Sequence, residues 1–230
     1  MRDEDPLHFI VSNFRSLESQ LMDCMEYIPY IRQNMDTVSP KFVPILIESC
    51  SIIDSIFSHM ASDNGHHHFK KFSMMHEERL QLEEASSLLL VSPMQILQPF
   101  KGWTRVQPEW WRAYNKVKHD RIGNYSAATY IYTVLALVGL HQVIARSWIF
   151  LENLMKAGWF NEADTEGWLE LVGSRHACSG PPDLPVETKL VVSPIRDTFI
   201  ESTDGNCPVV SQEWKFSARV TNYIWDHEWG

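Results

Sequence analysis

The chain has 230 residues, of which 44% are hydrophobic, and it carries 20 Lys and Arg residues against 29 Asp and Glu, for a formal net charge of −9. That length and hydrophobic content suffice for one domain with a sizeable core. The negative charge excludes a protein that coats nucleic acid by bulk electrostatics, so any binding to RNA or DNA depends on a local basic patch.

The cysteines and the N-terminus indicate the cellular compartment. Cys24, Cys50, Cys178 and Cys207 lie far apart and form no CxxC pair or zinc-ligand spacing. The first two fall inside helical patterns, which favours reduced, buried thiols over a disulfide framework. The N-terminal segment MRDEDPLHF is acidic and has no apolar signal core. We therefore expect a cytoplasmic protein.

The first half of the chain predicts three helices. Residues 7–35 place apolar side chains at helical spacing, and Pro29 is expected to kink or break this helix near its end. A second helix follows Ser39 and Pro40, which suit the N-cap and the first helical position, and runs through the segment ILIESCSIIDSIFSHM. A third helix is expected over residues 69–90, and residues 93–108 are predicted to form an irregular connection.

Residues 127–155 form the most apolar predicted helix. It is hydrophobic almost all round, as is typical of the central element of a bundle. Its uncharged stretch, residues 127–140, is shorter than the ~20 residues that cross a bilayer. A membrane-associated protein using residues 127–151 is the alternative, but we interpret the segment as a buried helix and expect no membrane association.

The character of the chain changes near residue 161. Residues 173–185 have the composition of a loop, and the segments KLVVSPI, DTFIES and WKFSARVTNYIW alternate in a way that predicts two or three short strands. The predicted fold is therefore mainly α: a helical bundle over residues 1–160 and a small β-containing C-terminal extension over residues 161–230.

The segment PEWWRAYNKVKHDR, residues 108–121, concentrates cationic and aromatic side chains in an acidic protein. At ~100° per residue, a helix here would place Trp110, Tyr114 and Val117 on one face, with Ala113 beside them. The opposite face would carry Arg112, Asn115, Lys116 and His119, and no Asp or Glu.

This face has an ordinary and a functional interpretation. The ordinary one is a solvated helix face, on which the histidine and the asparagine are incidental. The functional one is a phosphate-binding site, because a stripe of donors without carboxylates attracts anions. Histidine is also the side chain whose unperturbed pKa suits proton transfer near neutral pH.

An Arg followed after six residues by a His, as in RAYNKVKH, resembles the motif of the HEPN superfamily (the higher eukaryotes and prokaryotes nucleotide-binding domain). The hallmark of that family is an Arg, four to six residues and a His at the end of a helix in an all-α bundle. The resemblance covers roughly residues 7–155 and implies a HEPN-like helical bundle.

The resemblance implies a metal-independent endoribonuclease without a cofactor, a toxin or phage-defence effector whose composite active site forms at a homodimer interface. By similarity, His119 exchanges protons with the reacting oxygens, Arg112 holds the scissile phosphate, and Asn115 orients the phosphate or the imidazole. Flanking RNA backbone would be bound by Lys116, Lys118 and Arg121. An antitoxin or regulatory protein would be a further partner.

One position departs from the family pattern. The family often places a polar residue directly after the Arg, and here that residue is Ala113. Because some members of the superfamily have no nuclease activity, the alternative function is a non-catalytic module that binds a nucleotide, RNA or protein.

Weaker features have mainly structural interpretations. The segment GHHHFKKF, residues 65–72, is expected to be a solvated loop, and the Glu-rich residues 76–85 a solvated helix face. His141 is expected to be a core histidine. Glu48 and Asp54 are expected to be surface or capping carboxylates. The alternative is that one of them pairs with Arg112 or His119 and orients that side chain.

Overall fold

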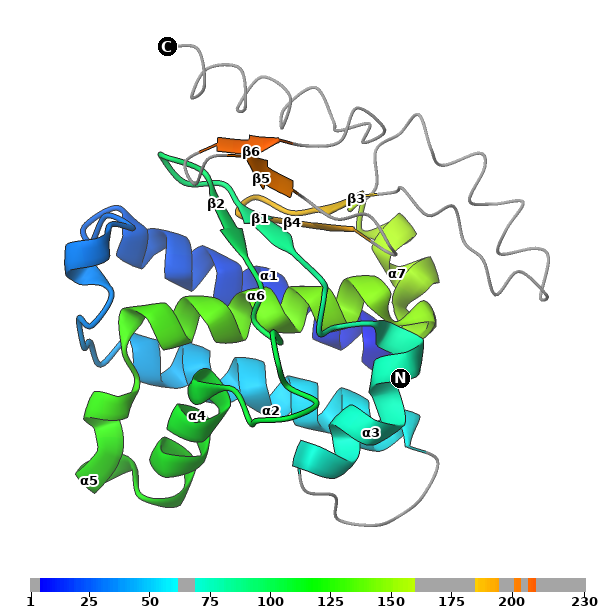
Figure 1. Cartoon of the computed structure of the whole chain (residues 1–230), viewed down its shortest axis with the longest axis horizontal. Coiled ribbons are helices and arrows are strands. Elements are labelled where there is room, and N and C mark those ends of the chain that lie inside the picture. Colours follow the sequence, from blue (N-terminus) through cyan, green and yellow to red (C-terminus); the bar gives the residue numbers. More distant parts are fainter. Residues whose placement is uncertain (1–4, 62–68, 160–184, 195–200, 204–206, 210–230) are drawn as a thin grey trace.

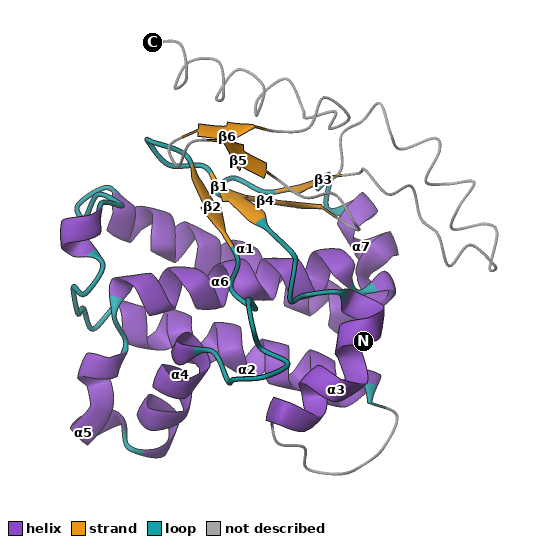
Figure 2. Cartoon of the chain, viewed as in Figure 1, coloured by secondary structure: helices purple, strands orange, loops and turns teal. Residues whose placement is uncertain are grey.

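Helices account for most of the computed structural model, which describes residues 5–61, 69–159, 185–194, 201–203 and 207–209 (Figure 2). The α-helices are α1 (Pro6–Met25), α2 (Phe42–Met60), α3 (Phe69–Leu80), α4 (Glu109–His119), α5 (Arg121–Asn124), α6 (Tyr130–Arg146) and α7 (Leu151–Lys156). Short 3-10 helices occur at Arg32–Asn34, Tyr125–Ala127 and Trp148–Phe150.

The strands form two small antiparallel sheets. A four-stranded sheet has the order β2 (Gln95–Leu97), β1 (Ser87–Leu89), β4 (Val191–Pro194) and β3 (Pro185–Glu187). A separate pair consists of β5 (Glu201–Thr203) and β6 (Cys207–Val209). The predicted class, mainly α with a small β component, is confirmed. The larger sheet joins strands from both sides of the predicted boundary at residue 160, since Leu88 pairs with Val192.

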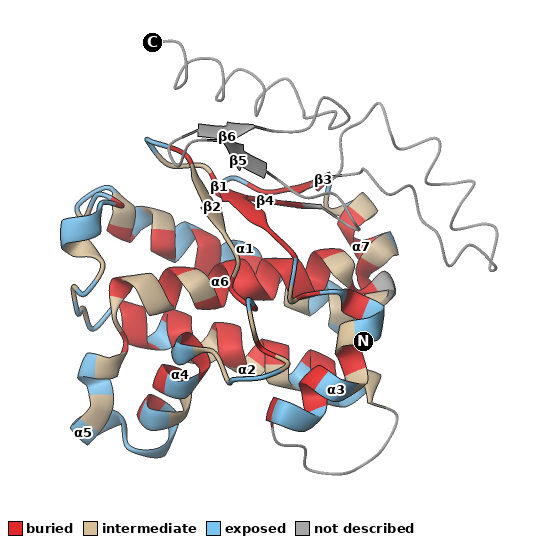
Figure 3. Ribbon diagram, viewed as in Figure 1, coloured by how far each residue is buried: buried red, intermediate tan, exposed pale blue. Residues whose placement is uncertain are grey.

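Helix α6 lies between the larger sheet and the other long helices (Figure 1). It contacts α1, α2 and α4 as well as β1 and β4. Thirteen of its 17 residues are buried, which explains why its sequence is apolar on every side (Figure 3). The prediction of a central helix in this region is confirmed.

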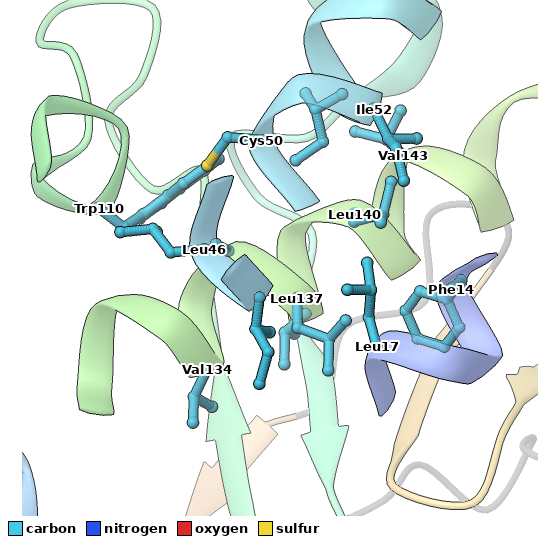
Figure 4. Close-up of a cluster of buried hydrophobic side chains, with 14 of the residues drawn as sticks. Phe14, Leu17, Leu46, Cys50, Ile52, Trp110, Val134, Leu137, Leu140 and Val143 are labelled. Atoms are coloured by element: carbon cyan, nitrogen blue, oxygen red, sulfur yellow. The ribbon is translucent and has the colours of Figure 1, made fainter. Parts of the chain in front are cut away.

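The main core lies between α6 and its helical neighbours. Figure 4 shows side chains from α1, α2, α4 and α6 meeting there, among them Phe14, Leu46, Trp110 and Leu137. At one point the helix backbone itself is in close contact: a side chain at Gly139 would come within 3.3 Å of the Phe100 ring. A Cβ at this position would require the Phe100 ring to move by a few tenths of an ångström, so glycine allows α6 to approach the segment before α4 closely.

A buried polar network joins α6 to the larger sheet. Nδ1 of His141 lies 2.7 Å from the Ser193 hydroxyl, which lies 2.6 Å from the Ser87 hydroxyl. Gln142 donates to the Ser87 hydroxyl at 2.9 Å and to the Ala85 carbonyl at 3.1 Å. All four of these side chains are buried, so their hydrogen bonds fix how the sheet sits on the helix.

A second polar contact fastens the β3–β4 hairpin to α1. The buried carboxylate of Glu18 accepts hydrogen bonds from the Thr188 hydroxyl and from the Leu190 backbone N–H. In the same hairpin, the Glu187 backbone N–H donates to the Trp159 carbonyl at 2.7 Å, and the Trp159 ring stacks on His141 at a centroid distance of 5.5 Å. His141 is thus a core histidine, as predicted.

The third helix is shorter than predicted and ends at Leu80 instead of residue 90. Gln81 has a positive φ of 49°, and the Glu77 carboxylate accepts the N–H groups of Leu82 and Glu83, which replaces the next helical hydrogen bonds. The chain leaves the helix here and then forms strand β1. Glu77 also accepts from the Trp103 indole, so the Glu-rich segment is not simply a solvated face, and that prediction was wrong for Glu77.

The remaining boundaries also differ from the predictions. The first helix ends at Met25, four residues before Pro29, the residue predicted to kink or break it. The predicted helix over residues 127–155 stops at Arg146 because Ser147 is extended. The predicted irregular connection contains β2. Strands occur within or beside KLVVSPI and DTFIES, as predicted. The segment WKFSARVTNYIW lies outside the described residues.

Two observations bear on the compartment. Cys24 and Cys50 are free and buried, as predicted, and burial raises the pKa of the Cys50 thiol. Helix α2 is long and apolar enough to cross a membrane by length and composition, but 56% of its most apolar window is buried within the fold. Such burial is consistent with a core helix of a soluble protein.

We predict that His141 makes the fold sensitive to acid. Burial lowers the pKa of His141 from 6.5 to about 3, so the unfolded chain takes up a proton first as the pH falls. Stability from this group is present above pH 6.5 and is lost on acidification, by about 2 kcal/mol between pH 7.5 and pH 5. Urea unfolding of the wild type and of His141→Gln over this range should show a smaller pH dependence in the variant. Equal slopes would contradict the assignment.

Candidate functional site

Local sequence determines both ends of helix α4. Pro108 precedes its first residue, and Glu109 in the first turn and His119 in the last complement the helix dipole. The helix ends because Asp120 is extended. The Asp120 carboxylate then accepts the Gly123 N–H at 2.9 Å and begins the one-turn helix α5.

The buried face of α4 is the one predicted. Trp110 is 1% exposed, donates its indole N–H to the Pro99 carbonyl at 2.7 Å and packs edge-on against Phe100. Tyr114 and Val117 are also buried. Trp111 is buried as well, because α3 covers that side of the helix: the Trp111 and Phe69 ring centroids lie 4.7 Å apart.

The opposite face is exposed, as the periodicity predicts. Arg112, Lys116 and His119 are exposed, and Asn115 is half-buried at the edge of this face. Arg112 forms an ion pair with Glu109 on its own helix, at 2.6 Å. Both partners are largely exposed, so this pair is weak and opens readily to another anion. Within the described part of the chain, His119 and Lys116 have no side-chain hydrogen bond or ion pair.

The other two predicted RNA-binding cations have different positions. Lys118 points away from the exposed face, and its ammonium lies 5.1 Å from the centroid of the Tyr114 ring. Hydrogen bonding to Tyr114 raises the pKa of Lys118, and the nearby Asp54 carboxylate acts in the same direction. Arg121 is exposed on α5, directly beyond the end of α4.

A cavity of about 470 Å³ opens beside α4 and was not anticipated from the sequence. Its walls come from α2, α3, the segment before α4, and α4 itself. The lining residues are Asp54, Phe69, Lys70, Phe72, Trp103, Arg105, Gln107, Trp111, Tyr114, Asn115 and Lys118. It combines aromatic rings with three cationic side chains from three different elements. No periodic pattern reveals it, because its residues come together only when α2, α3 and α4 pack.

The expected carboxylate partners are placed elsewhere. Glu48 accepts a hydrogen bond from Asn13 on α1 at 2.9 Å, and Asp54 lines the cavity near Lys118. Arg112 pairs instead with Glu109. Ala113, the position that departs from the family pattern, is 4% exposed and faces the core. A polar side chain there would need a buried partner, and Asn115 lies on a different side of the helix.

No group of three or more metal-ligating side chains occurs within the described residues. Residues 62–68, which include the three consecutive histidines, lie outside them. Comparisons of the chain with protein-family models, with curated proteins and with solved structures gave no match. The functional argument therefore depends on the two features of α4: its exposed Arg112/His119 face and the cavity beside it.

We predict that the two faces of α4 differ sharply in their effect on stability. Trp110→Ala should lower the free energy of unfolding by about 3–5 kcal/mol, because it leaves a cavity and an unpaired Pro99 carbonyl. Arg112→Ala, Lys116→Ala and His119→Ala should each change it by less than about 0.5 kcal/mol. Urea unfolding followed by circular dichroism measures all four. A large loss in any exposed-face variant would show that this face has a structural role.

Proposed function

We propose that this protein is a metal-independent endoribonuclease of HEPN type that acts as a homodimer. The observation that carries the proposal is that Arg112 and His119 are exposed together on one face of α4, two turns apart, with Lys116 between them. Nothing in the packing of the described chain requires these three side chains, so their joint presentation is available for a ligand.

The chemistry requires only groups that this face presents. The ribose 2′-oxygen attacks the adjacent phosphorus, the bond from phosphorus to the 5′-oxygen breaks, and a 2′,3′-cyclic phosphate forms. One imidazole accepts the proton from the 2′-hydroxyl, and a second imidazole donates a proton to the leaving 5′-oxygen. Arg112 binds the phosphate and stabilises its developing charge. Two copies of α4 supply both imidazoles from the single His119.

The electrostatics of the region support an RNA ligand. The chain has a net charge of −9, yet Arg112, Lys116 and Arg121 are exposed on α4 and the following turn, where they outnumber the exposed carboxylates of Glu109 and Asp120. A local cationic surface on an acidic protein favours contact with a phosphate backbone at this place over general adhesion to nucleic acid. We further propose a cytoplasmic toxin or phage-defence effector, restrained by an antitoxin or regulatory protein.

A second candidate function is a non-catalytic binding module on the same fold. Two observations favour it: Ala113 is buried, so no polar side chain follows Arg112, and Glu109 already binds the Arg112 guanidinium. Such a module would bind RNA or a nucleotide through the same face and release no product. Binding and cleavage must therefore be measured separately.

We predict that the purified protein cleaves RNA in EDTA and leaves 2′,3′-cyclic phosphate ends. His119→Ala and Arg112→Ala should each lower the cleavage rate by about a hundredfold or more, because each removes a group that acts in the transition state. His59→Ala, which removes another exposed histidine, serves as the matched control and should leave the rate unchanged. Binding of RNA by the wild type without product would favour the binding module instead.

We predict that cleavage depends on dimer formation next to α4. Ile122 on α5 is 91% exposed, an unusual position for an isoleucine, and it lies three residues beyond His119. Ile122→Glu should shift the protein towards monomers in sedimentation and lower the cleavage rate in parallel. Phe9→Glu makes the same kind of change on α1, where Phe9 is 65% exposed, and should affect neither measurement. Full activity of a monomeric Ile122→Glu protein would exclude a composite site.

A further inference from the structure

We propose that the cavity beside α4 binds one base of the RNA, that of a nucleotide adjacent to the scissile phosphate. This inference rests on the proposed ribonuclease function and assigns it a specificity subsite. The cavity and the exposed face share one helix, and Asn115 belongs to the cavity lining while lying at the edge of that face. Asn115 is only four residues, or about 6 Å along the helix axis, from His119.

The inner wall of the cavity has the chemistry that a base requires. Phe69 and Trp111 form a close pair whose rings are tilted by 45°, and Trp103 lies 5.7 Å from Phe69. These rings are at most 7% exposed, so the part that reaches the cavity offers a base apolar and aromatic contact, whatever the base. The cavity volume, about 470 Å³, falls within the usual range for small-ligand sites of about 300–1,000 Å³.

This wall is held rigidly. The Trp103 indole donates to the Glu77 carboxylate, which is itself fixed by the N–H groups of Leu82 and Glu83. The neighbouring Glu83 carboxylate binds Thr104 and Arg105 from the same segment as Trp103. The segment before α4 is therefore attached to the end of α3 by two carboxylates. A preformed wall lowers the entropy lost when a ligand binds.

The rim of the cavity has the chemistry that a phosphate requires. Lys70 from α3, Arg105 from the segment before α4, and Lys118 from α4 contribute three cations to the lining. They outnumber its one carboxylate, that of Asp54, which interacts with Lys118. All three are exposed, although Arg105 pairs with Glu83 at 3.1 Å and Lys118 lies over Tyr114. The amides of Gln107 and Asn115 add donors and acceptors that suit the hydrogen-bonding edge of a base.

A planar ring carrying an anionic group satisfies both parts of the cavity at once. An acidic peptide would use the cationic rim but would leave the aromatic wall without a matching surface. An apolar ligand would use the wall but would make no use of the cations or the amides. A nucleotide uses the wall, the amides and the rim, and the continuation of its backbone leads past Asn115 to Arg112 and His119.

The test is binding of the four ribonucleoside monophosphates to the full chain, by calorimetry and by saturation-transfer NMR, with inorganic phosphate as a separate probe. We expect at least one monophosphate to bind saturably and more tightly than phosphate. Lys70→Glu should weaken that binding by about tenfold, because it reverses a charge at the rim. Lys101→Glu makes the same change at an exposed lysine that does not line the cavity, and should leave binding unchanged.

The outcomes separate this inference from the proposed function. Absence of saturable nucleotide binding, or equal effects of Lys70→Glu and Lys101→Glu, overturns the base subsite. So does inorganic phosphate binding as tightly as the nucleotides. His119→Ala should abolish cleavage and leave monophosphate binding intact. Sequencing of cleavage products should show a changed base preference next to the cut site in Gln107→Ala, and an unchanged preference would also count against the subsite.

Discussion

The whole structure depends on burying α6 on all sides. A helix with 13 buried residues out of 17 must be covered by other elements around its circumference, and no single partner can do this. Helices α1, α2 and α4 cover part of it, and the four-stranded sheet covers another part. The polar side chains His141 and Gln142 face the sheet, where Nδ1 of His141 hydrogen-bonds with the Ser193 hydroxyl and the Gln142 amide N–H donates to the Ser87 hydroxyl. These hydrogen bonds orient the sheet in a way that apolar contact would not.

This arrangement determines the position of α4. Because α4 packs on both α2 and α6, one side of the helix is fully used for anchoring, and Trp110 and Trp111 are held rigidly. The other side is left to the solvent together with Arg112, Lys116 and His119. A functional group carried on a rigid, packed helix is placed more precisely than one on a loop. The same packing forms the walls of the cavity, because Phe69 of α3 packs against Trp111 and the segment before α4 contributes further lining residues.

The exposed face and the cavity adjoin at Asn115, which lies at the edge of the face and lines the cavity. The face carries the groups suited to phosphate and proton transfer, whereas the cavity combines an aromatic wall with a cationic rim. In the proposed function, the first performs the reaction and the second selects where it occurs. The weak Arg112–Glu109 pair fits this division, since an exposed ion pair within one helix gives way at little cost to a phosphate.

The sequence by itself determined the features that depend on local periodicity. The apolar helix around residues 130–146, the two faces of α4, the core position of His141 and the mainly helical class all follow from spacing along the chain. Periodicity did not predict the end of α3, because the Glu77 carboxylate accepts the Leu82 and Glu83 N–H groups in place of the next helical turn. Nor did it predict β1, which pairs with β2 and, about a hundred residues further along the chain, with β4. The cavity likewise exists only through tertiary structure, since its lining comes from four segments that share no sequence pattern. The local sequence pattern determines which face of a helix is buried. Long-range packing determines which elements that face contacts and which cavities remain beside the helix.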